Sequence, residues 1–74
     1  MKNEDNSPWG ARIERGRIVT KYTVNNAYFY DVESIDRPGV TIYKIPGDDN
    51  YTANTAVFFF AFEDGKGAIM RPIL

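Results

Sequence analysis

Apolar side chains are most concentrated near the end of the chain, in the segments AVFFFAFE at 56–63 and AIMRPI at 68–73. Both segments are dominated by aromatic, branched and other apolar residues, a composition typical of β-strands. The sequence DGKG at 64–67 separates them, and aspartate and glycine are the residues that tight hairpin turns require. We therefore predict that residues 56–73 form a β-hairpin, with Gly65 at positive φ.

The first strand of this hairpin is apolar on both of its faces. Alternate residues point to opposite sides of a strand, so two sets of side chains arise. The sets are Phe58, Phe60 and Phe62 on one face and Val57, Phe59 and Ala61 on the other. A strand of this kind lies between two layers or covers a partner. We expect the face with three phenylalanines to be the core face, so that Phe59 faces outward.

Alternation of apolar and polar residues predicts three earlier strands, at 17–24, 27–35 and 40–45. In the first of them Ile18, Tyr22 and Val24 share a face, which we expect to pack against the three phenylalanines of the hairpin. Five short strands joined by turn residues are typical of a small barrel. The predicted fold is all-β: a small five-stranded antiparallel barrel, SH3-like or OB-like, without a well-formed helix.

Turn chemistry supports these boundaries. Asn25-Asn26 separates the first two strands, and Pro38 and Gly39 occupy the central positions of a type II turn that starts at Arg37. The loop at 46–55 has no helical period. The first eight residues are polar and charged, so we expect a disordered tail at 1–8 and a single barrel domain at 9–74.

Composition limits the chemistry that the chain can perform. The 74 residues are 43% hydrophobic and 15% aromatic, enough for a single small core. The chain contains no cysteine and no histidine. This excludes disulfides, thiolate or imidazole metal ligands and nucleophilic mechanisms that use either residue. We expect no enzymatic activity, no cofactor and no metal.

Acidic residues are interpreted as structural. Asp31 and Glu33 lie two apart on one strand and are expected to form a solvated face, because no base or phosphate loop accompanies them. The sequence contains no run of eighteen apolar residues. Its first residues are acidic and polar, and they lack the basic segment followed by an apolar segment that a signal peptide requires. Neither a membrane span nor a signal peptide is therefore predicted, and the expected location is the cytoplasm of the host cell or a virion.

Charge leaves one alternative function open. The basic residues Arg12, Arg15, Arg17 and Lys21 precede the second strand. The candidates for stacking are the rings of Tyr22, Tyr28, Phe29, Tyr30 and Tyr43. Aromatic rings beside a basic strand can stack the bases of a single-stranded nucleic acid. The net charge of −1 argues against this function, because neutralisation of phosphates provides most of that affinity.

The stretch at 28–74 resembles the small OB- or SH3-like β-barrels of tailed phages, found in tail spikes and baseplates. The residues that carry the resemblance are Val57 to Phe62, Glu63-Asp64-Gly65 and Ile69 to Ile73. The resemblance implies a structural adaptor of a virion or prophage particle.

The leading prediction is a non-catalytic protein-interaction or structural module of phage or prophage origin. Its partner would be another protein chain, including a second copy of itself, and no membrane. Trp9, Phe29 and Phe59 are predicted to form the contact surface, because aromatic anchors dominate protein interfaces. A barrel that binds single-stranded nucleic acid is the alternative.

Overall fold

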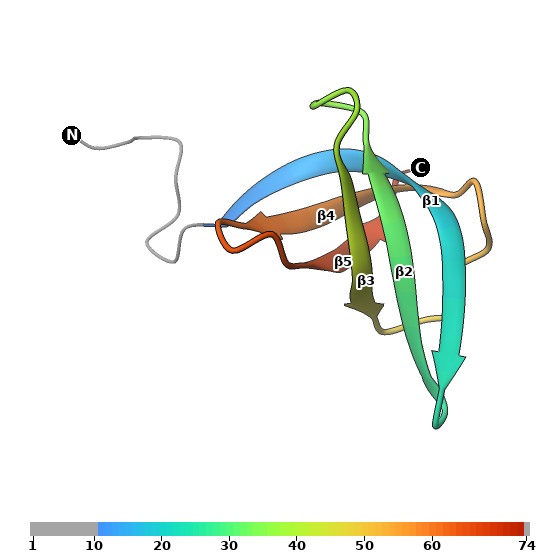
Figure 1. Cartoon of the computed structure of the whole chain (residues 1–74). Coiled ribbons are helices and arrows are strands. Elements are labelled where there is room, and N and C mark those ends of the chain that lie inside the picture. The colour runs from blue at the N-terminus through green and yellow to red at the C-terminus, as the bar shows by residue number, and fades with distance from the viewer. Residues whose placement is uncertain (1–10, 74) are drawn as a thin grey trace.

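The computed structural model describes residues 11–73, so the predicted tail at 1–8 and Trp9 lie outside the described residues. The described chain has five strands and no helix (Figure 1). The strands are β1 (Ala11–Val24), β2 (Ala27–Ser34), β3 (Thr41–Gly47), β4 (Ala56–Phe62) and β5 (Gly67–Pro72). The predicted all-β class is confirmed. β1 begins six residues before the predicted 17, so it is the longest strand.

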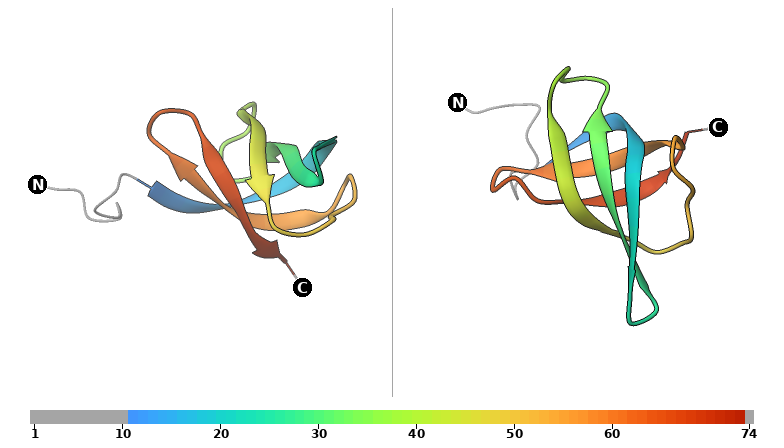
Figure 2. Two further views of the ribbon diagram at one scale, coloured as in Figure 1. Left: turned by 90° about the horizontal axis from the view of Figure 1, so that it is seen from below. Right: turned by 45° about the vertical axis from the view of Figure 1, so that its right-hand side comes forward.

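All five strands belong to one antiparallel sheet with the order β3-β2-β1-β4-β5. The sheet curls until its edge strands β3 and β5 lie next to each other (Figure 2). The positions that a Cβ would occupy on Gly47 and Gly67 lie 3.3 Å from Ile69 Cγ1 and 3.6 Å from Ile45 Cγ2, which shows how near the two strands are. No hydrogen-bonded register joins β3 to β5 within residues 11–73, so a closed barrel is not confirmed.

β1 is shared by both halves of the sheet. Its first half pairs with β4 and its second half with β2, and Gly16 takes part in both ladders. A Cβ on Gly16 would lie 2.5 Å from Val32 Cγ1 and 2.7 Å from Phe59 Cε1, so only glycine fits where the strand bends.

The core lies inside the curl and consists of Ile18, Tyr30, Val32, Ile42, Ile45, Val57, Phe59, Ala61 and Ile69. Phe59 is 0% exposed, whereas Phe58 and Phe60 are half-buried and Phe62 is exposed. The predicted faces of β4 are therefore reversed. The interior of so small a sheet accepts one phenylalanine ring between two smaller side chains, but not three rings in a row.

Two β-bulges lie opposite Asp31, one in β1 between Ile18 and Thr20 and one in β3 opposite the segment from Tyr30 to Val32. An extra residue in a strand moves every later side chain to the other face. Ile18 therefore points inward, whereas Tyr22, beyond the bulge, points outward. The prediction that Ile18, Tyr22 and Val24 share a core face is wrong for this reason.

The predicted turns are confirmed. Asn25 and Asn26 both have positive φ, 50° and 66°, as a primed hairpin turn requires. Gly39 has a φ of 85°, and Val40 N donates to the Arg37 carbonyl at 3.1 Å, which closes the type II turn. Gly65 has a φ of 86°, the left-handed region that favours glycine.

Candidate binding surfaces

The structure does not form the contact surface predicted from the sequence. Phe59 is fully buried in the core, so a partner cannot reach it in the folded chain. Phe29 is half-buried on the outer face of β2. Trp9 lies outside the described residues. The prediction that Phe59 anchors a partner is therefore wrong.

The residues of the alternative nucleic-acid face are also dispersed. Tyr30 is fully buried, and its hydroxyl donates to the Asp49 carbonyl at 2.5 Å. Tyr28 is half-buried beneath Lys21, whose ammonium lies 5.4 Å from the Tyr28 ring centroid and also donates to Asn50 Oδ1. Of the five predicted stacking rings, Tyr22, Phe29 and Tyr43 lie on the outer face, whereas Tyr28 and Tyr30 do not.

The arginines of that face are separated as well. Arg12 enters a cavity at one end of the sheet, while Arg15 and Arg17 lie on the outer face of β1. Arg15 is held by Asp36: its Nη2 and Nε donate to Asp36 Oδ1 at 2.7 and 3.1 Å, and its backbone N–H donates to Oδ2 at 2.8 Å. The basic residues therefore form no single stripe.

The three-phenylalanine face of β4 is the solvent side of the sheet. Register places Arg15 and Arg71 beside Phe58. Ile13 and Ala68 lie beside Phe60 in the same way. Ile13 is 56% exposed and Phe62 is 39% exposed. We call the set Ile13, Phe58, Phe60 and Phe62 the β4 stripe.

The β4 stripe has arginines at its Phe58 end. The guanidinium carbon of Arg71 lies 5.0 Å from the Phe58 ring centroid, a cation–π contact. Arg15 stands on the other side, and its hydrogen bonds lower the pKa of the Asp36 carboxyl. The same hydrogen bond raises the pKa of Arg15. One end of the stripe is therefore flanked by two guanidinium groups, of which that of Arg15 is paired with Asp36.

A second aromatic surface lies where the two bulges meet. Asp31 is only 6% exposed, so the prediction of a solvated face is wrong at this position. Its carboxylate accepts hydrogen bonds from Tyr22 Oη at 2.7 Å and from the backbone N–H of Lys44 at 2.9 Å. The first of these bonds raises the pKa of Tyr22.

This second surface, the tyrosine face, consists of Tyr22, Val24, Phe29, Tyr43 and Lys44. Four of these residues, all except Tyr43, line a shallow pocket of about 280 Å³. Tyr43 is 68% exposed, and Lys44 has a positive φ of 54°, which is rare for a lysine. The bulge in β3 thus aims Tyr43 and Lys44 outward.

A buried carboxylate lies at the opposite end of the molecule. Glu14 points inward from β1 and is 4% exposed. Its Oε1 accepts the Ser34 hydroxyl at 3.1 Å, and its Oε2 lies 2.7 Å from Arg37 Nε and 3.2 Å from Arg12 Nη1. Charges far apart in the sequence therefore meet at one point.

Sequence reasoning missed the β4 stripe, Glu14 and Arg37. Side-chain volume could have predicted which face of β4 is exposed. Val57, Phe59 and Ala61 together fill a narrow interior better than three phenylalanine rings do. For Glu14, the signal was its place between Arg12 and Gly16 on the inward alternation of β1. Nothing in the sequence connects Arg37 with Glu14.

Comparisons of this chain with protein-family models, curated proteins and solved structures find no match. Within residues 11–73, no three acidic, cysteine or histidine side chains gather as a metal site would require. The part of the chain that the structure describes has no helix able to span a membrane.

Proposed function

We propose that this chain is a non-catalytic protein-interaction module of phage or prophage origin that pairs with a second copy of itself through the β4 stripe. We further propose that the sheet is an OB-like small barrel, a five-stranded and partly open class. The pairing of β1 with both β2 and β4, and the position of β3 beside β5, support this class. The proposed origin rests on the sequence pattern of Val57 to Phe62, Glu63-Asp64-Gly65 and Ile69 to Ile73 alone.

The observation that carries the proposal is the solvent-facing β4 stripe. β4 is hydrogen-bonded on both sides, so its outer face is a continuous surface and not a frayed edge. Phe58, Phe60 and Phe62 follow one another along it, with Ile13 beside Phe60. Contiguous exposed apolar side chains mark association surfaces, and phenylalanine and arginine are both enriched in interfaces.

Charge at the two ends of the stripe supports a second copy as the occupant. Arg71 flanks the Phe58 end, and the exposed Glu63 follows Phe62 at the other end. A two-fold interface brings the same patch of both copies together. If the two β4 strands run antiparallel, the Arg71 end of each stripe lies over the end of the other stripe where Glu63 follows Phe62, and Glu63 there also lines the end cavity.

Sedimentation equilibrium from about 10 µM to 1 mM tests this pairing. The wild-type chain is expected to dimerise, and Phe60→Ser is expected to weaken dimerisation by at least about tenfold, because the stripe loses its central ring. Val19→Ser is the matched control, since Val19 is 44% exposed and lies outside the stripe. Circular dichroism verifies that both variants remain folded.

Charge reversal gives a second test that removes no apolar contact. Arg71→Glu alone should weaken the dimer, whereas Arg71→Glu combined with Glu63→Arg should restore it, because opposite charges meet again. A wild-type chain that stays monomeric throughout the concentration range would overturn the pairing. So would a dimer that Phe60→Ser leaves unchanged.

The tyrosine face supports a second candidate function, binding of single-stranded nucleic acid. In OB-folds the face of the second and third strands binds oligonucleotides. Here Phe29 of β2 and Tyr43 of β3 lie on that face with Lys44. In OB-folds the turn between the fourth and fifth strands also contributes to this binding site. In this chain that turn carries the acidic residues Glu63 and Asp64, which repel phosphates.

Fluorescence anisotropy with labelled oligothymidine at low salt tests the second candidate. Binding that weakens with rising salt and is lost in Tyr43→Ala would support it, because stacking on one ring contributes about 1–3 kcal/mol per base. Arg17→Ala serves as the control, since Arg17 lies away from the tyrosine face. No binding at low salt removes this candidate.

A further inference from the structure

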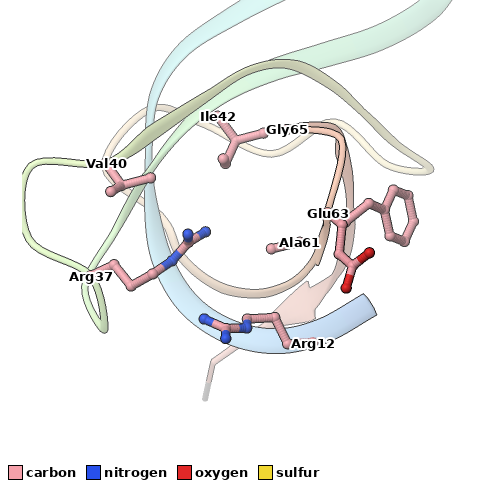
Figure 3. Close-up of a pocket in the computed structure, with 8 residues that line it drawn as sticks. Arg12, Arg37, Val40, Ile42, Ala61, Glu63 and Gly65 are labelled. Carbon is pink, nitrogen blue, oxygen red and sulfur yellow. The ribbon is translucent and has the colours of Figure 1, made fainter. Parts of the chain in front are cut away.

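A cavity of about 450 Å³ lies at the end of the curled sheet, between the start of β3 and the turn that joins β4 to β5 (Figure 3). Val40, Ile42 and Ala61 form its apolar wall, and Arg12 and Arg37 enter it with their guanidinium groups. Neither aromatic surface described above includes these arginines. The cavity therefore combines an apolar wall with two cations.

The two guanidinium groups are only partly neutralised. Both lie against the same oxygen of Glu14, Arg37 Nε at 2.7 Å and Arg12 Nη1 at 3.2 Å. Glu14 is buried and does not line the cavity, so it pairs with the arginines from the protein interior and not from the cavity. The two guanidinium groups thus share one buried carboxylate. The other carboxylate at the cavity, Glu63, makes no ion pair with either arginine within residues 11–73.

Hydrogen-bonding capacity remains as well. The buried Arg37 Nε lies close to Glu14 but makes no hydrogen bond within residues 11–73. The Arg12 side chain donates one such bond, to Glu14. A guanidinium group has five N–H donors in a fixed fork, so several donors of this pair are available to a ligand.

Backbone contacts fix Arg37 in place. Its N–H donates to Ser34 Oγ at 2.9 Å, and its carbonyl accepts Val40 N in the type II turn at 3.1 Å. Ser34 in turn donates to Glu14. A cation held in this way loses little additional freedom when a ligand binds.

From this arrangement we propose that the cavity binds the carboxylate of a monoanion that carries an apolar group, such as the C-terminal residue of a peptide. The planar carboxylate matches the guanidinium fork, and the apolar group packs on Val40, Ile42 and Ala61. Glu63 lines the rim and repels a second negative charge, which favours a monoanion over a phosphate dianion.

NMR titration of the wild-type chain with N-acetyl-leucine, in low-chloride buffer at pH 7, tests the proposal. Saturable shifts are expected at the backbone amides of Arg37, Val40 and Ala61. N-acetyl-leucinamide, which has the same apolar group without the charge, should bind at least about tenfold more weakly, because it loses charge-assisted hydrogen bonds. Inorganic phosphate forms the third arm and should not compete at equal concentration.

Variants distinguish binding in the cavity from nonspecific attraction of the anion by surface charge. Arg12→Gln should weaken N-acetyl-leucine about tenfold or more while the Arg37–Glu14 pair keeps the fold. Arg37→Lys retains the charge but removes the fork and should also weaken binding. Arg17→Gln, an exposed arginine outside the cavity, should not change it. Thermal unfolding confirms that each variant is folded.

Three results would overturn the proposal. The first is equal affinity for N-acetyl-leucine and its amide, and the second is an absence of saturable shifts. The third is tighter binding of phosphate, which would make the cavity a site for another class of anion. Phe62 belongs both to the β4 stripe and to the cavity lining, so sedimentation of the same samples reports the oligomeric state separately and distinguishes failure of this proposal from failure of the dimer.

Discussion

At the residue scale, neighbouring phenylalanines of β4 have opposite roles. Phe59 is fully buried and its ring lies against the space that Gly16 leaves open, whereas Phe60 is half-buried on the outer face between Ile13 and Ala68. The residue type is identical, so the difference arises only from the face on which each side chain falls. The sequence could not show which face of β4 is buried, because both faces are apolar. Alternation of residues identifies a buried face only when the other face is polar.

Phe59→Ala is expected to lower the free energy of unfolding by about 3–5 kcal/mol, because it leaves a cavity in the core. That loss is comparable to the whole stability of many small domains, so the variant should be largely unfolded. Phe60→Ala should stay folded, with a loss of less than about 1.5 kcal/mol, since water already reaches that ring. Urea unfolding followed by circular dichroism measures both. Equal losses in the two variants would contradict the face assignment.

At the element scale, turns and strand number could be predicted, whereas strand faces could not. Asn25-Asn26, Pro38-Gly39 and Gly65 specify turns through local backbone chemistry, and the structure confirms each of them. The bulge after Ile18 depends on how β1 pairs with β2, so it left no local signal and reversed the face of Tyr22. The start of β1 was missed because its segment carries three charged residues, and the burial of one of them, Glu14, depends on Ser34 and Arg37, which are distant in sequence.

Gly65 provides the test at this scale. Its φ of 86° disfavours any side chain, while a Cβ at this position would have no atom within 4 Å apart from those of its chain neighbours, so Gly65→Val should cost backbone strain alone. We expect a loss of about 1–3 kcal/mol. Lys66→Val at the next, exposed position should cost less than about 0.5 kcal/mol. Thermal unfolding of both variants gives the comparison, and a Gly65→Val variant as stable as the wild type would contradict the turn geometry.

At the scale of the whole molecule, the candidate sites could not be predicted because each is assembled from distant segments. The end cavity combines Arg12 of β1 with Arg37 of the loop before β3, and Glu14 and Ser34 support both. The β4 stripe depends on the curl of the entire sheet, which decides which face of β4 is outside. The sequence analysis named Arg12 as a candidate site residue but not Glu14, Ser34 or Arg37, because only the fold brings these four residues together.

The Arg15–Asp36 contact ties β1 to the loop between β2 and β3 and predicts a pH dependence. The hydrogen bonds from Arg15 lower the pKa of Asp36 below its unfolded value of about 3.9. Asp36 therefore stabilises the fold above that value, and this contribution is lost as the pH falls through the folded pKa. Because the contact is exposed, added salt should weaken it.

Urea unfolding of the wild type and of Asp36→Asn at pH 6 and pH 2 tests this dependence. The wild-type chain should be the more stable of the two at pH 6, and the difference should shrink at pH 2, where Asp36 is protonated. Arg17→Gln is a suitable control for the loss of a surface charge. A stability difference that does not change with pH would show that the carboxylate charge plays no part.

The arrangement of β1, β4 and β5 has a mechanical consequence. β1 and β5 flank β4, and Ala11 lies opposite Phe62 whereas Pro72 lies opposite Val57, at the other end of β4. A force that pulls residues 11 and 73 apart therefore acts along the strands. It loads the hydrogen bonds of both ladders together in shear, whereas unzipping would load them one at a time. This topology resists stretching through the ends of the sheet, even though the seam between β3 and β5 has no hydrogen bonds to strengthen it.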